Sequence, residues 1–439
     1  MESIWQSNSS RIRFEEAEGT KSTDVLIIGG GIAGILCAYR LKNAGVDCML
    51  AETEEIYGGI TKNTTAKITL CHGLIYDKMI KRFGEETAQL YAKAQLDALR
   101  EYEHLCQKID CDFERKDNYI YSLDDRQKIE KEASALNRIG IKADFIDTCE
   151  LPFKIAGAVC VKNQAQFNPL KFLYEISKNL PIYEHTKITE LLPHKAITEH
   201  GEINFNKLIV ATHFPIFNKH GAYFLKLYQH RSYVISLKGA QELDGMYVDE
   251  CDKGLSFRNY GDILLLGGGG HRTGKQGGCW HELEDFARKH YKSAEIIGKW
   301  AAQDCMTLDD IPYIGQYSKS TPSTFVATGF NKWGMTNAMV ATDIICKLVQ
   351  DEPSPYAEIF SPSRSILRPQ LAANAFESVI NLLTPTALRC PHLGCALKYN
   401  RVEHSWDCPC HGSRFTREGK LIDNPATADK KIYKTAIRN

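Results

Sequence analysis

The sequence predicts an α/β protein with an additional antiparallel region and a small, separate C-terminal module. A glycine-rich turn joins a buried strand to a helix near residue 30, and strand-like runs follow one another between residues 216 and 304. Four cysteines lie in residues 390–411, together with His392 and His411. At roughly 100–200 residues per domain, 439 residues allow two or three domains.

Composition excludes several classes of protein. With 43% hydrophobic residues, the chain is too apolar to be disordered. Its 54 basic and 54 acidic side chains give a net charge of +0, so nothing favours nucleic acid as a partner. No apolar run approaches the roughly 20 residues of a membrane span, and the first residues lack the apolar core of a signal peptide. We therefore expect a cytoplasmic protein.

The first clear unit is strand–helix–strand, over residues 24–51. DVLII is typical of a buried strand, ILCAYRLKNAG has helical periodicity, and VDCMLAE is the second strand. Gly29, Gly31 and Gly34 fall at the spacing that permits a tight turn, close approach of a pyrophosphate, and close packing of helix on strand. Glu52 ends the second strand and can accept hydrogen bonds from ribose hydroxyls. This context predicts a dinucleotide site.

Further elements follow in order. We expect a long helix over 85–106, a strand over 203–215 and an antiparallel layer over 216–304, with a charged helix at 280–302. Residues 321–350 predict a strand, a glycine-bounded turn and a helix. A second glycine-rich run, GDILLLGGGGH, lacks a following amphipathic helix, so we interpret it as a strand rather than a site for NAD.

The C-terminal cysteines and histidines have metal-ligand spacing. Cys390-x-His392 and Cys408-x-x-His411 supply two thiolates and two imidazoles. Tetrahedral zinc is one interpretation, although zinc ribbons usually carry C-x-x-C. A disulfide without metal would leave both histidines unexplained. The third interpretation is a [2Fe–2S] centre with two Cys and two His ligands.

The wording CPHLGC…CPCHGS resembles the Rieske family. The resemblance implies that Cys390 and Cys408 bind one iron of a [2Fe–2S] cluster, and that His392 and His411 bind the other. It further implies that a disulfide between Cys395 and Cys410 joins the two cluster loops, and that the Ser413 hydroxyl donates a hydrogen bond to the cluster. Phe415 stands where high-potential members have a tyrosine donor.

Residues 22–350 resemble the flavoprotein superfamily of glycine oxidase, sarcosine oxidase and D-amino-acid oxidase. The resemblance rests on the strand–helix–strand unit, on LIVATHFP, and on LDDIPYIG followed by FVATGFNKWGMT. It implies a Rossmann-like FAD-binding domain with an inserted α+β substrate domain. By this resemblance, a further set of residues lies along the flavin: Thr212, Gly329, Trp333, Gly334, Met335 and Thr336.

The segment 58–73 occupies the place of the superfamily's loop beneath the cofactor. Thr64, Thr65 and Lys67 are expected to donate to phosphate or flavin oxygens, and His72 is a candidate acid or base. Cys305-Met306 matches the place where sarcosine oxidases carry the cysteine that bonds covalently to flavin, which makes Cys305 a candidate for such a link.

Substrate residues are expected on the strands of the antiparallel layer. Arg258, Tyr260 and Tyr233 fall on strands that line the substrate pocket in the resembled flavoproteins. An arginine beside aromatic rings can clamp a carboxylate with two hydrogen bonds.

The two resemblances divide the chain into an FAD-binding domain, a substrate-binding domain and a Rieske module, with a linker before the module. Residues 351–370 hold four of the fifteen prolines and indicate a linker. The ranges are FAD-binding 22–82, 153–215 and 305–350, substrate-binding 83–152 and 216–304, linker 351–387, and Rieske module 388–439.

The expected function is that of an FAD-dependent oxidoreductase. It would oxidise a small organic substrate, an amine or amino acid, and pass electrons singly through the cluster to an acceptor such as a protein. The alternative is an electron-transfer or redox-sensing protein that works with a protein partner and has no dedicated substrate. A Rieske oxygenase is disfavoured, because no iron site of two histidines and a carboxylate is evident.

Overall fold

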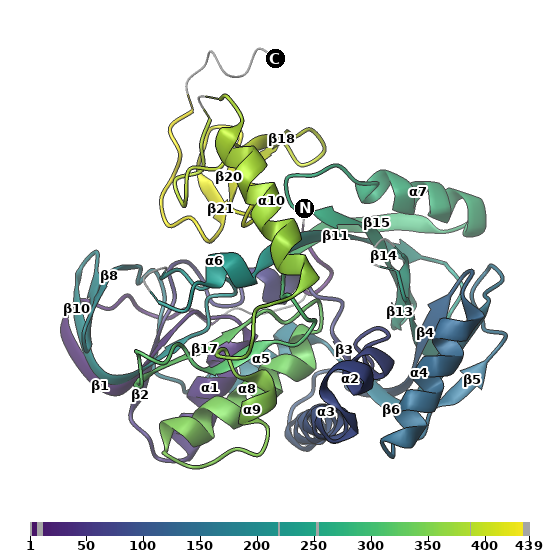
Figure 1. Cartoon of the computed structure of the whole chain (residues 1–439), viewed down its shortest axis with the longest axis horizontal. Helices are drawn as coiled ribbons and strands as arrows, with labels where there is room; N and C mark the ends of the chain where they lie inside the picture. The colour runs from purple at the N-terminus through teal and green to yellow at the C-terminus, as the bar shows by residue number, and fades with distance from the viewer. Residues whose placement is uncertain (1, 7–11, 218–219, 252–253, 387, 433–439) are drawn as a thin grey trace.

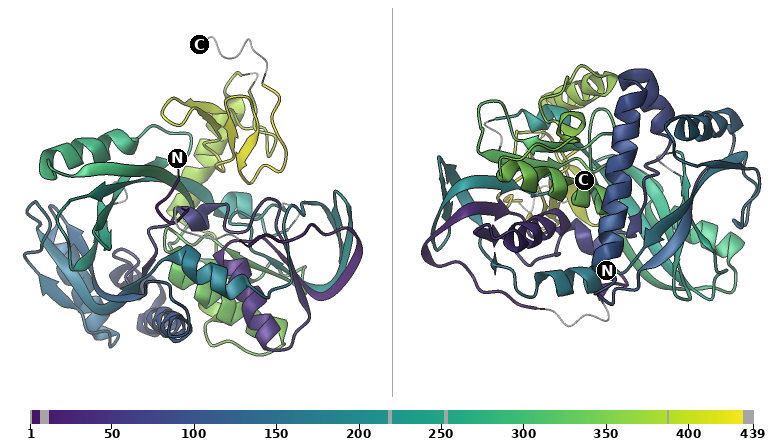
Figure 2. Two further views of the ribbon diagram at one scale, coloured as in Figure 1. Left: turned by 180° about the vertical axis from the view of Figure 1, so that it is seen from behind. Right: turned by 90° about the horizontal axis from the view of Figure 1, so that it is seen from below.

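The chain folds around three β-sheets (Figure 1). We describe it from a computed structural model, which covers residues 2–6, 12–217, 220–251, 254–386 and 388–432. The two larger sheets form the body of the molecule, and the third belongs to a C-terminal module that stands on one side of that body (Figure 2).

The first sheet carries the predicted dinucleotide unit. Its order is β16-β17-β10-β1-β2-β7, and β17, β10, β1, β2 and β7 run parallel. Its strands are β1 (Gly19–Ile28), β2 (Cys48–Ala51), β7 (Ile182–Tyr183), β8 (Ile188–Leu192), β9 (Lys195–Thr198), β10 (Gly201–Val210), β16 (Tyr313–Gln316) and β17 (Thr324–Thr328). Three helices belong to this part of the chain, α1 (Ile32–Asn43), α5 (Pro169–Ser177) and α8 (Gly334–Val349), and α1 packs against the other two. This is the Rossmann-like arrangement that the sequence predicts.

The second sheet is mainly antiparallel, in the order β15-β11-β14-β13-β12-β4-β6-β3, with β5 paired to β6. Its strands are β3 (Lys67–Ile68), β4 (Glu114–Ser122), β5 (Asp144–Ile146), β6 (Gly157–Gln166), β11 (Tyr228–Lys238), β12 (Gly245–Asp249), β13 (Ser256–Tyr260), β14 (Ile263–Arg272) and β15 (Glu295–Met306). The remaining helices of the body are α2 (Tyr76–Phe83), α3 (Glu85–Cys106), α4 (Arg126–Arg138), α6 (Tyr223–Lys226) and α7 (Cys279–His290), with a short 3₁₀ turn, η2, at Ile60–Asn63. The predicted α+β insertion is thereby confirmed.

The helix expected over 280–302 is wrong in its second half. The helix α7 ends at His290, and β15 then runs antiparallel along the whole length of β11, from Glu295 to Met306. Pairing with a distant strand decides the conformation of these residues, and local propensity cannot reveal such a partner. The glycine-rich run is strand β14, hydrogen-bonded between β11 and β13, as expected.

The C-terminal module is a four-stranded antiparallel meander. Its strands are β18 (Lys398–Asn400), β19 (Ser405–Asp407), β20 (Arg414–Thr416) and β21 (Leu421–Asp423). One cysteine–histidine loop precedes β18 and the other joins β19 to β20, so the two loops come from the same end of the chain's smallest sheet.

The segment 351–387, expected as a linker, contains two helices, α9 (Ala357–Phe360) and α10 (Pro369–Leu383). Pro369 occupies the first turn of α10, where proline is well tolerated because its missing N–H has no partner in a helix anyway. Arg364 ties the connection to the body through an ion pair with the buried Asp309, at 2.8 Å. No helix within the described ranges is long and apolar enough to cross a membrane.

Candidate functional site

The glycine turn after β1 has the geometry of a dinucleotide site. Gly29 has φ +111°, and a Cβ there would lie 2.6 Å from the carbonyl oxygen of Ala211. A Cβ on Gly34 would collide with the carbonyl oxygen of Gly29, so helix α1 packs on the turn only because Gly34 lacks one. At Gly31 the nearest atom is the Thr61 hydroxyl, 3.5 Å away, which leaves the backbone open to a phosphate.

Glu52 ends β2 beside this turn. Its carboxylate accepts a hydrogen bond from the amide of Gly30 at 2.6 Å and another from Glu54 at 3.0 Å. Burial raises the pKa of Glu52. The carboxylate is therefore oriented by the backbone and faces the cavity, as an acceptor for ribose hydroxyls must be.

A cavity of about 1200 Å³ lies at the carboxyl ends of the parallel strands. It exceeds the usual 300–1,000 Å³ of a small-molecule pocket, so a dinucleotide and a small substrate fit together. Most predicted cofactor residues line it: Gly29, Gly31, Glu52, Thr64, Thr65, Lys67, Thr212, Cys305, Gly329, Trp333, Gly334 and Met335. His72 and Tyr233 also line it, whereas Gly34 and Thr336 lie just behind its wall.

Helix α8 begins at this cavity. Its N-terminal residues Gly334 and Met335 form part of the wall, and Trp333 precedes them. Unpaired N–H groups and the helix dipole make such an N-terminus favourable for negative charge. Thr336 turns inward and donates a hydrogen bond to the carbonyl oxygen of Thr69, so it holds the helix against the loop rather than reaching the cavity.

His72 is a positioning residue rather than a free acid or base. Its Nδ1 is 2.7 Å from the Tyr91 hydroxyl, and its Nε2 is 3.0 Å from the carbonyl oxygen of Thr69. Its ring stacks on Trp333 with centroids 5.1 Å apart. Burial lowers the pKa of His72 to about 3, so the imidazole is neutral at physiological pH. The predicted acid–base role is not supported, because both ring nitrogens are occupied.

Lys67 is the buried cation of the wall. Its ammonium group donates to the Thr65 hydroxyl at 3.2 Å. Burial, together with the nearby charge of Arg258, lowers the pKa of Lys67 to about 7. An anionic group in the cavity would be stabilised by this cation, as expected of a loop beneath a phosphate or a flavin.

Arg258 and Tyr260 do not line the cavity, which corrects their predicted role in holding substrate. The Arg258 guanidinium is buried and donates to the carbonyl oxygens of Thr65 (2.6 Å) and Ala66 (3.1 Å), so it supports the loop that carries Lys67. The Tyr260 hydroxyl donates to Asp112 at 2.6 Å. By alternation they share a face of β13 with Ser256, which does line the cavity, but Arg258 is covered there by the loop that carries Thr65 and Ala66.

Tyr233 does line the cavity, on β11. Its hydroxyl donates to the carboxylate of Glu403 at 2.8 Å and is 3.0 Å from Nε2 of His271. The same wall includes Ser256 and the acidic Asp249. None of the described residues that line the cavity is an arginine.

Cys305 also lines the cavity, with its sulfur 3.7 Å from the Thr328 hydroxyl. Burial raises the pKa of its thiol to about 12. The covalent link to flavin stays a prediction.

The C-terminal module brings two cysteines and two histidines together. A hydrogen bond from the Cys408 thiol, aided by the backbone amides of His392 and Leu393, lowers the pKa of Cys390 to about 7. Burial lowers the pKa of His392 to about 4 and, with the charge of His392, that of His411 to about 3. Thiolate and neutral imidazole are the ligand forms that a metal requires.

The two histidine rings converge. Their centroids are 5.0 Å apart, and neither nitrogen of His392 nor Nδ1 of His411 has a hydrogen-bond partner among the described residues. Buried polar atoms without partners are costly, and a [2Fe–2S] cluster bound by Cys390, His392, Cys408 and His411 would engage one ring nitrogen of each histidine. The residues present therefore fit the Rieske centre.

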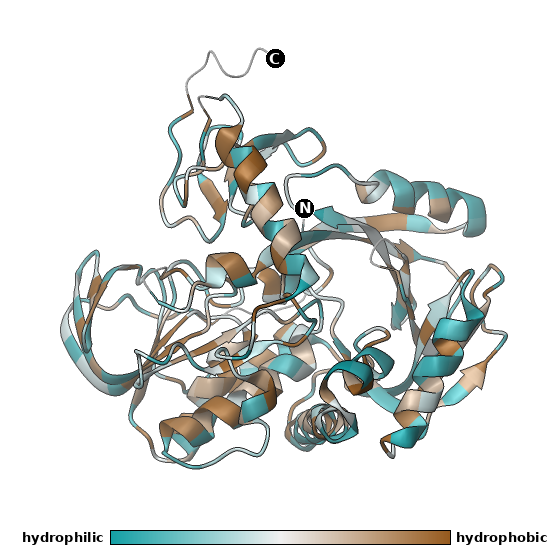
Figure 3. Cartoon of the chain, viewed as in Figure 1, coloured by the Kyte–Doolittle hydropathy of each residue, from teal (hydrophilic) through white to brown (hydrophobic). Residues whose placement is uncertain are grey.

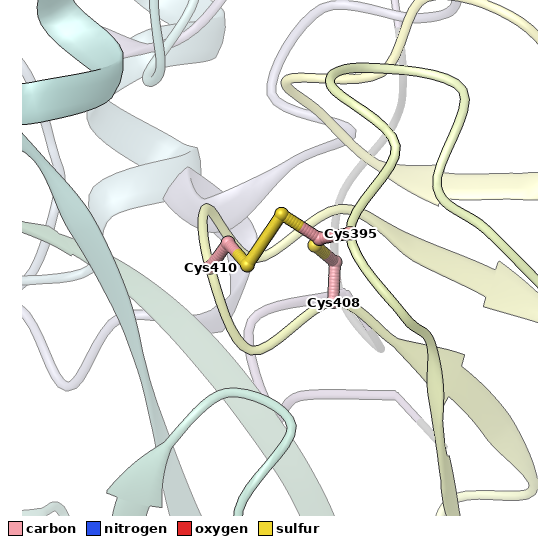
Figure 4. Close-up of side chains that lie close together, drawn as sticks. All are labelled: Cys395, Cys408 and Cys410. Atoms are coloured by element: carbon pink, nitrogen blue, oxygen red, sulfur yellow. A yellow bond between two sulfur atoms is a disulfide. The ribbon is translucent and has the colours of Figure 1, made fainter. Parts of the chain in front are cut away.

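Cys395 and Cys410 form the predicted disulfide (Figure 4). The sulfur of Cys408 lies within 4.8 Å of both sulfurs of this disulfide. Figure 4 shows the three side chains side by side. Because the disulfide sulfurs are bonded to each other, they are not thiolate ligands, and Cys408 is the ligand among the three. Ser413 hydrogen-bonds to Cys390, as its expected hydroxyl role requires, and Phe415 is fully buried.

The module packs directly on the cavity, through residues that the sequence patterns do not single out. Residues 420–424 and 426–429 line the same cavity as the glycine turn. The side-chain amide of Asn424 donates to the carbonyl oxygens of Thr212 (2.6 Å) and Phe214 (2.9 Å). Arg231 of β11 makes a buried ion pair with Glu403, whose carboxylate also binds Arg414 at 2.8 Å.

Fold and site thus define a flavin-dependent oxidoreductase that also carries a Rieske iron–sulfur module. Residues 24–348 match the FAD dependent oxidoreductase family (DAO), and residues 383–434 match the Rieske [2Fe-2S] domain. The chain belongs to the DAO family of FAD-dependent oxidoreductases, and its cofactors are FAD and a [2Fe–2S] cluster.

Relatives with known sequence or structure agree. The chain is 32% identical to the Rieske 2Fe-2S iron-sulfur protein YhfW of Bacillus subtilis (strain 168), over 97% of this chain and 96% of that one. Glycine oxidase from Geobacillus kaustophilus superposes with a TM-score of 0.66 at 16% identity, covering 79% of this chain and all of that one. L-proline dehydrogenase from P. horikoshii also gives 0.66, at 15% identity, over 79% and 98%. These two structures share the fold.

Proposed function

We propose that the protein oxidises a small amine or amino acid and passes the electrons singly, through its own Rieske module, to a separate acceptor. FAD is the natural converter between two-electron and one-electron chemistry. The observation that carries the proposal is the turn Thr212–Phe214, which follows β10 and touches both sites.

This turn contacts the cavity on one side and the histidines of the Rieske module on the other. Thr212 and His213 line the cavity, while the Phe214 ring lies edge-on to His392 and His411, with centroids 6.2 and 6.3 Å away. Phe214 is fully buried. Three consecutive residues therefore span the space between the cavity and the metal-binding histidines.

A second connection runs through two glutamines. Gln303, two residues before Cys305 on β15, donates to the carbonyl oxygen of Gly412 at 2.9 Å. Gln229 lies so close to Gly412 that a Cβ there would collide with its side chain, and it contacts His213 at 3.2 Å. Gly412 directly follows His411. The protein matrix between the two sites is thus short, packed and hydrogen-bonded.

The remaining residues of the cavity are placed to bind the dinucleotide and the substrate. The amides of the glycine turn and Glu52 are placed to bind the dinucleotide, and Lys67 and the start of α8 to stabilise negative charge in the cavity. The substrate side offers Ser256 and Asp249, whereas the Tyr233 hydroxyl is engaged with Glu403. None of the described lining residues is an arginine, which could bind a carboxylate with two hydrogen bonds. The wall therefore suits an amine group better than a carboxylate.

The test is anaerobic mixing of the holoprotein with a panel of primary and N-methylated amines and amino acids. We expect one group of amines to bleach the flavin absorbance, followed by the EPR signal of the reduced cluster. If no compound bleaches the flavin, the proposed substrate chemistry is wrong. Reduction by a protein donor instead would favour an electron-transfer protein.

The route is tested separately with Phe214→Leu, and with Phe217→Ala in the same loop as a control. Phe214→Leu should slow cluster reduction several-fold and leave bleaching of the flavin unchanged. Equal cluster-reduction rates in the wild type and both variants would contradict a route through Phe214.

A further inference from the structure

Helix α10 has its polar side inward and its apolar side outward. Asn374 and Asn381 are buried, while Phe376 and Leu383 are 67% and 75% exposed. At 100° per residue, Phe376, Val379, Ile380 and Leu383 lie on one face and the two asparagines on the opposite one. This is the reverse of a surface helix in a globular protein, and Figure 3 shows the apolar residues of α10 in brown.

The inward face is fixed by polar contacts, so the orientation is specific. Asn374 accepts a hydrogen bond from Arg272 at 2.9 Å, and Glu377 pairs with Lys275 at 2.7 Å. The carbonyl oxygen of Asn381 accepts the amide of Ala396, in the first cluster loop, at 3.0 Å. A rotation of the helix that buried the apolar side would break all three contacts.

The outward surface is a continuous apolar patch, which we call the α10 face. It consists of Phe376, Val379, Ile380, Leu382, Leu383 and the adjoining Leu393, each 41–75% exposed. Leu382 adjoins the first cluster loop, since a Cβ on Gly394 would lie 3.9 Å from its Cδ2. These side chains present on the order of several hundred Å², comparable with the roughly 800 Å² that each partner buries in a standard interface.

The charge on α10 indicates which kind of partner covers the α10 face. Glu377 is the one charged residue of α10, and its carboxylate is engaged with Lys275 on the inward side. Helices that lie in membrane interfaces carry lysines and arginines flanking the apolar face, and α10 has none. Transient redox partners usually meet over small interfaces. An uncharged apolar face is instead typical of interfaces between like chains, which are more apolar than transient ones.

We propose that the α10 face is covered by a second copy of this chain in a twofold homodimer. Phe376, Ile380 and Leu383 follow the 4,3 spacing of a helix–helix seam, so two antiparallel α10 helices related by a twofold axis bury the same residues from both copies. The chain's net charge of +0 opposes no such association. The half-buried His392, next to Leu393, would lie at the edge of this interface.

The test is the mass of the FAD- and cluster-loaded protein, measured by light scattering during size-exclusion chromatography. We expect twice the 49.5 kDa of one chain. Phe376→Glu should give a monomer with unchanged flavin and cluster spectra. Leu123→Glu, at a residue 55% exposed outside the patch, should remain dimeric.

A monomeric wild type would overturn the proposal, as would a dimer that Phe376→Glu leaves intact. A wild type that is monomeric and sediments with phosphatidylcholine vesicles would assign the patch to a lipid surface. If Phe376→Glu loses its cofactors, the milder Val379→Ser gives the same comparison.

Discussion

At the scale of single residues, burial decides what each polar group in the cavity can do. His72 is a plausible acid or base from its sequence context, yet its two ring nitrogens are both engaged and its pKa falls to about 3. Arg258 is chemically suited to bind a carboxylate but donates to backbone carbonyls instead. The residue type was predictable, and the direction of the side chain was not.

The buried His72 predicts a pH dependence of stability. Its folded pKa of about 3 lies below the ordinary 6.5, so between these values only the unfolded chain binds the proton. The free energy of unfolding therefore falls as pH falls below 6.5, by at most about 1.4 kcal/mol per pH unit from this group. Melting temperatures of the holoprotein from pH 7 to 5 should fall less steeply in His72→Asn than in the wild type. Replacing the exposed His281 in the same way should leave the slope unchanged; equal slopes in wild type and His72→Asn would contradict the assignment.

Gly34→Ala should abolish or severely weaken FAD binding. Its Cβ would collide with the carbonyl oxygen of Gly29, a backbone atom of the phosphate turn that cannot move without distorting it. The cost should be several kcal/mol, within the range of severe packing errors. Flavin absorbance per chain after purification measures it. A variant that retains stoichiometric FAD would show that the turn tolerates the shift.

At the scale of elements, the sequence predicts what local patterns determine. The strand–helix–strand unit over 24–51 and the helix over 85–106 were correctly predicted, because their periodicity is strong. The helix over 280–302 fails after His290, where pairing with β11 takes over. The spacing of the cysteines and histidines predicted a metal site, and the resemblance to the Rieske family implied its ligands, all four of which belong to two short loops of one module.

The ion pair between β11 and the loop after β18 should hold the module on the body. Burial alone would raise the pKa of Glu403, but Arg231 and Arg414 together hold it below its usual value. Removing one member of a buried pair typically costs about 3–5 kcal/mol. In Glu403→Gln, thermal loss of the cluster's visible circular dichroism should begin at a lower temperature than in the wild type. Glu85→Gln, which breaks an exposed pair with Arg138, should have little effect. An unshifted transition in Glu403→Gln would mean that the pair contributes little to docking.

At the scale of the whole molecule, the contacts that dock the Rieske module on the cavity could not be predicted from the sequence. The residues that carry it, such as Asn424 and Gln303, have no motif, and their partners are more than a hundred residues away along the chain. Yet this docking places residues of both modules around a single cavity, an arrangement that the proposed electron transfer requires.

The docking predicts that electron transfer from flavin to cluster is intramolecular. After anaerobic reduction by substrate, the rate at which the cluster's EPR signal appears should not change when the protein is diluted tenfold. The monomeric Phe376→Glu variant should show the same rate, since the contacts of Phe214, Gln303 and Asn424 lie within one chain. A rate that falls in proportion to concentration would mean that the cluster accepts electrons from another molecule. A rate that falls only in Phe376→Glu would place the route across the dimer, because α10 is anchored to the first cluster loop through Asn381 and Ala396.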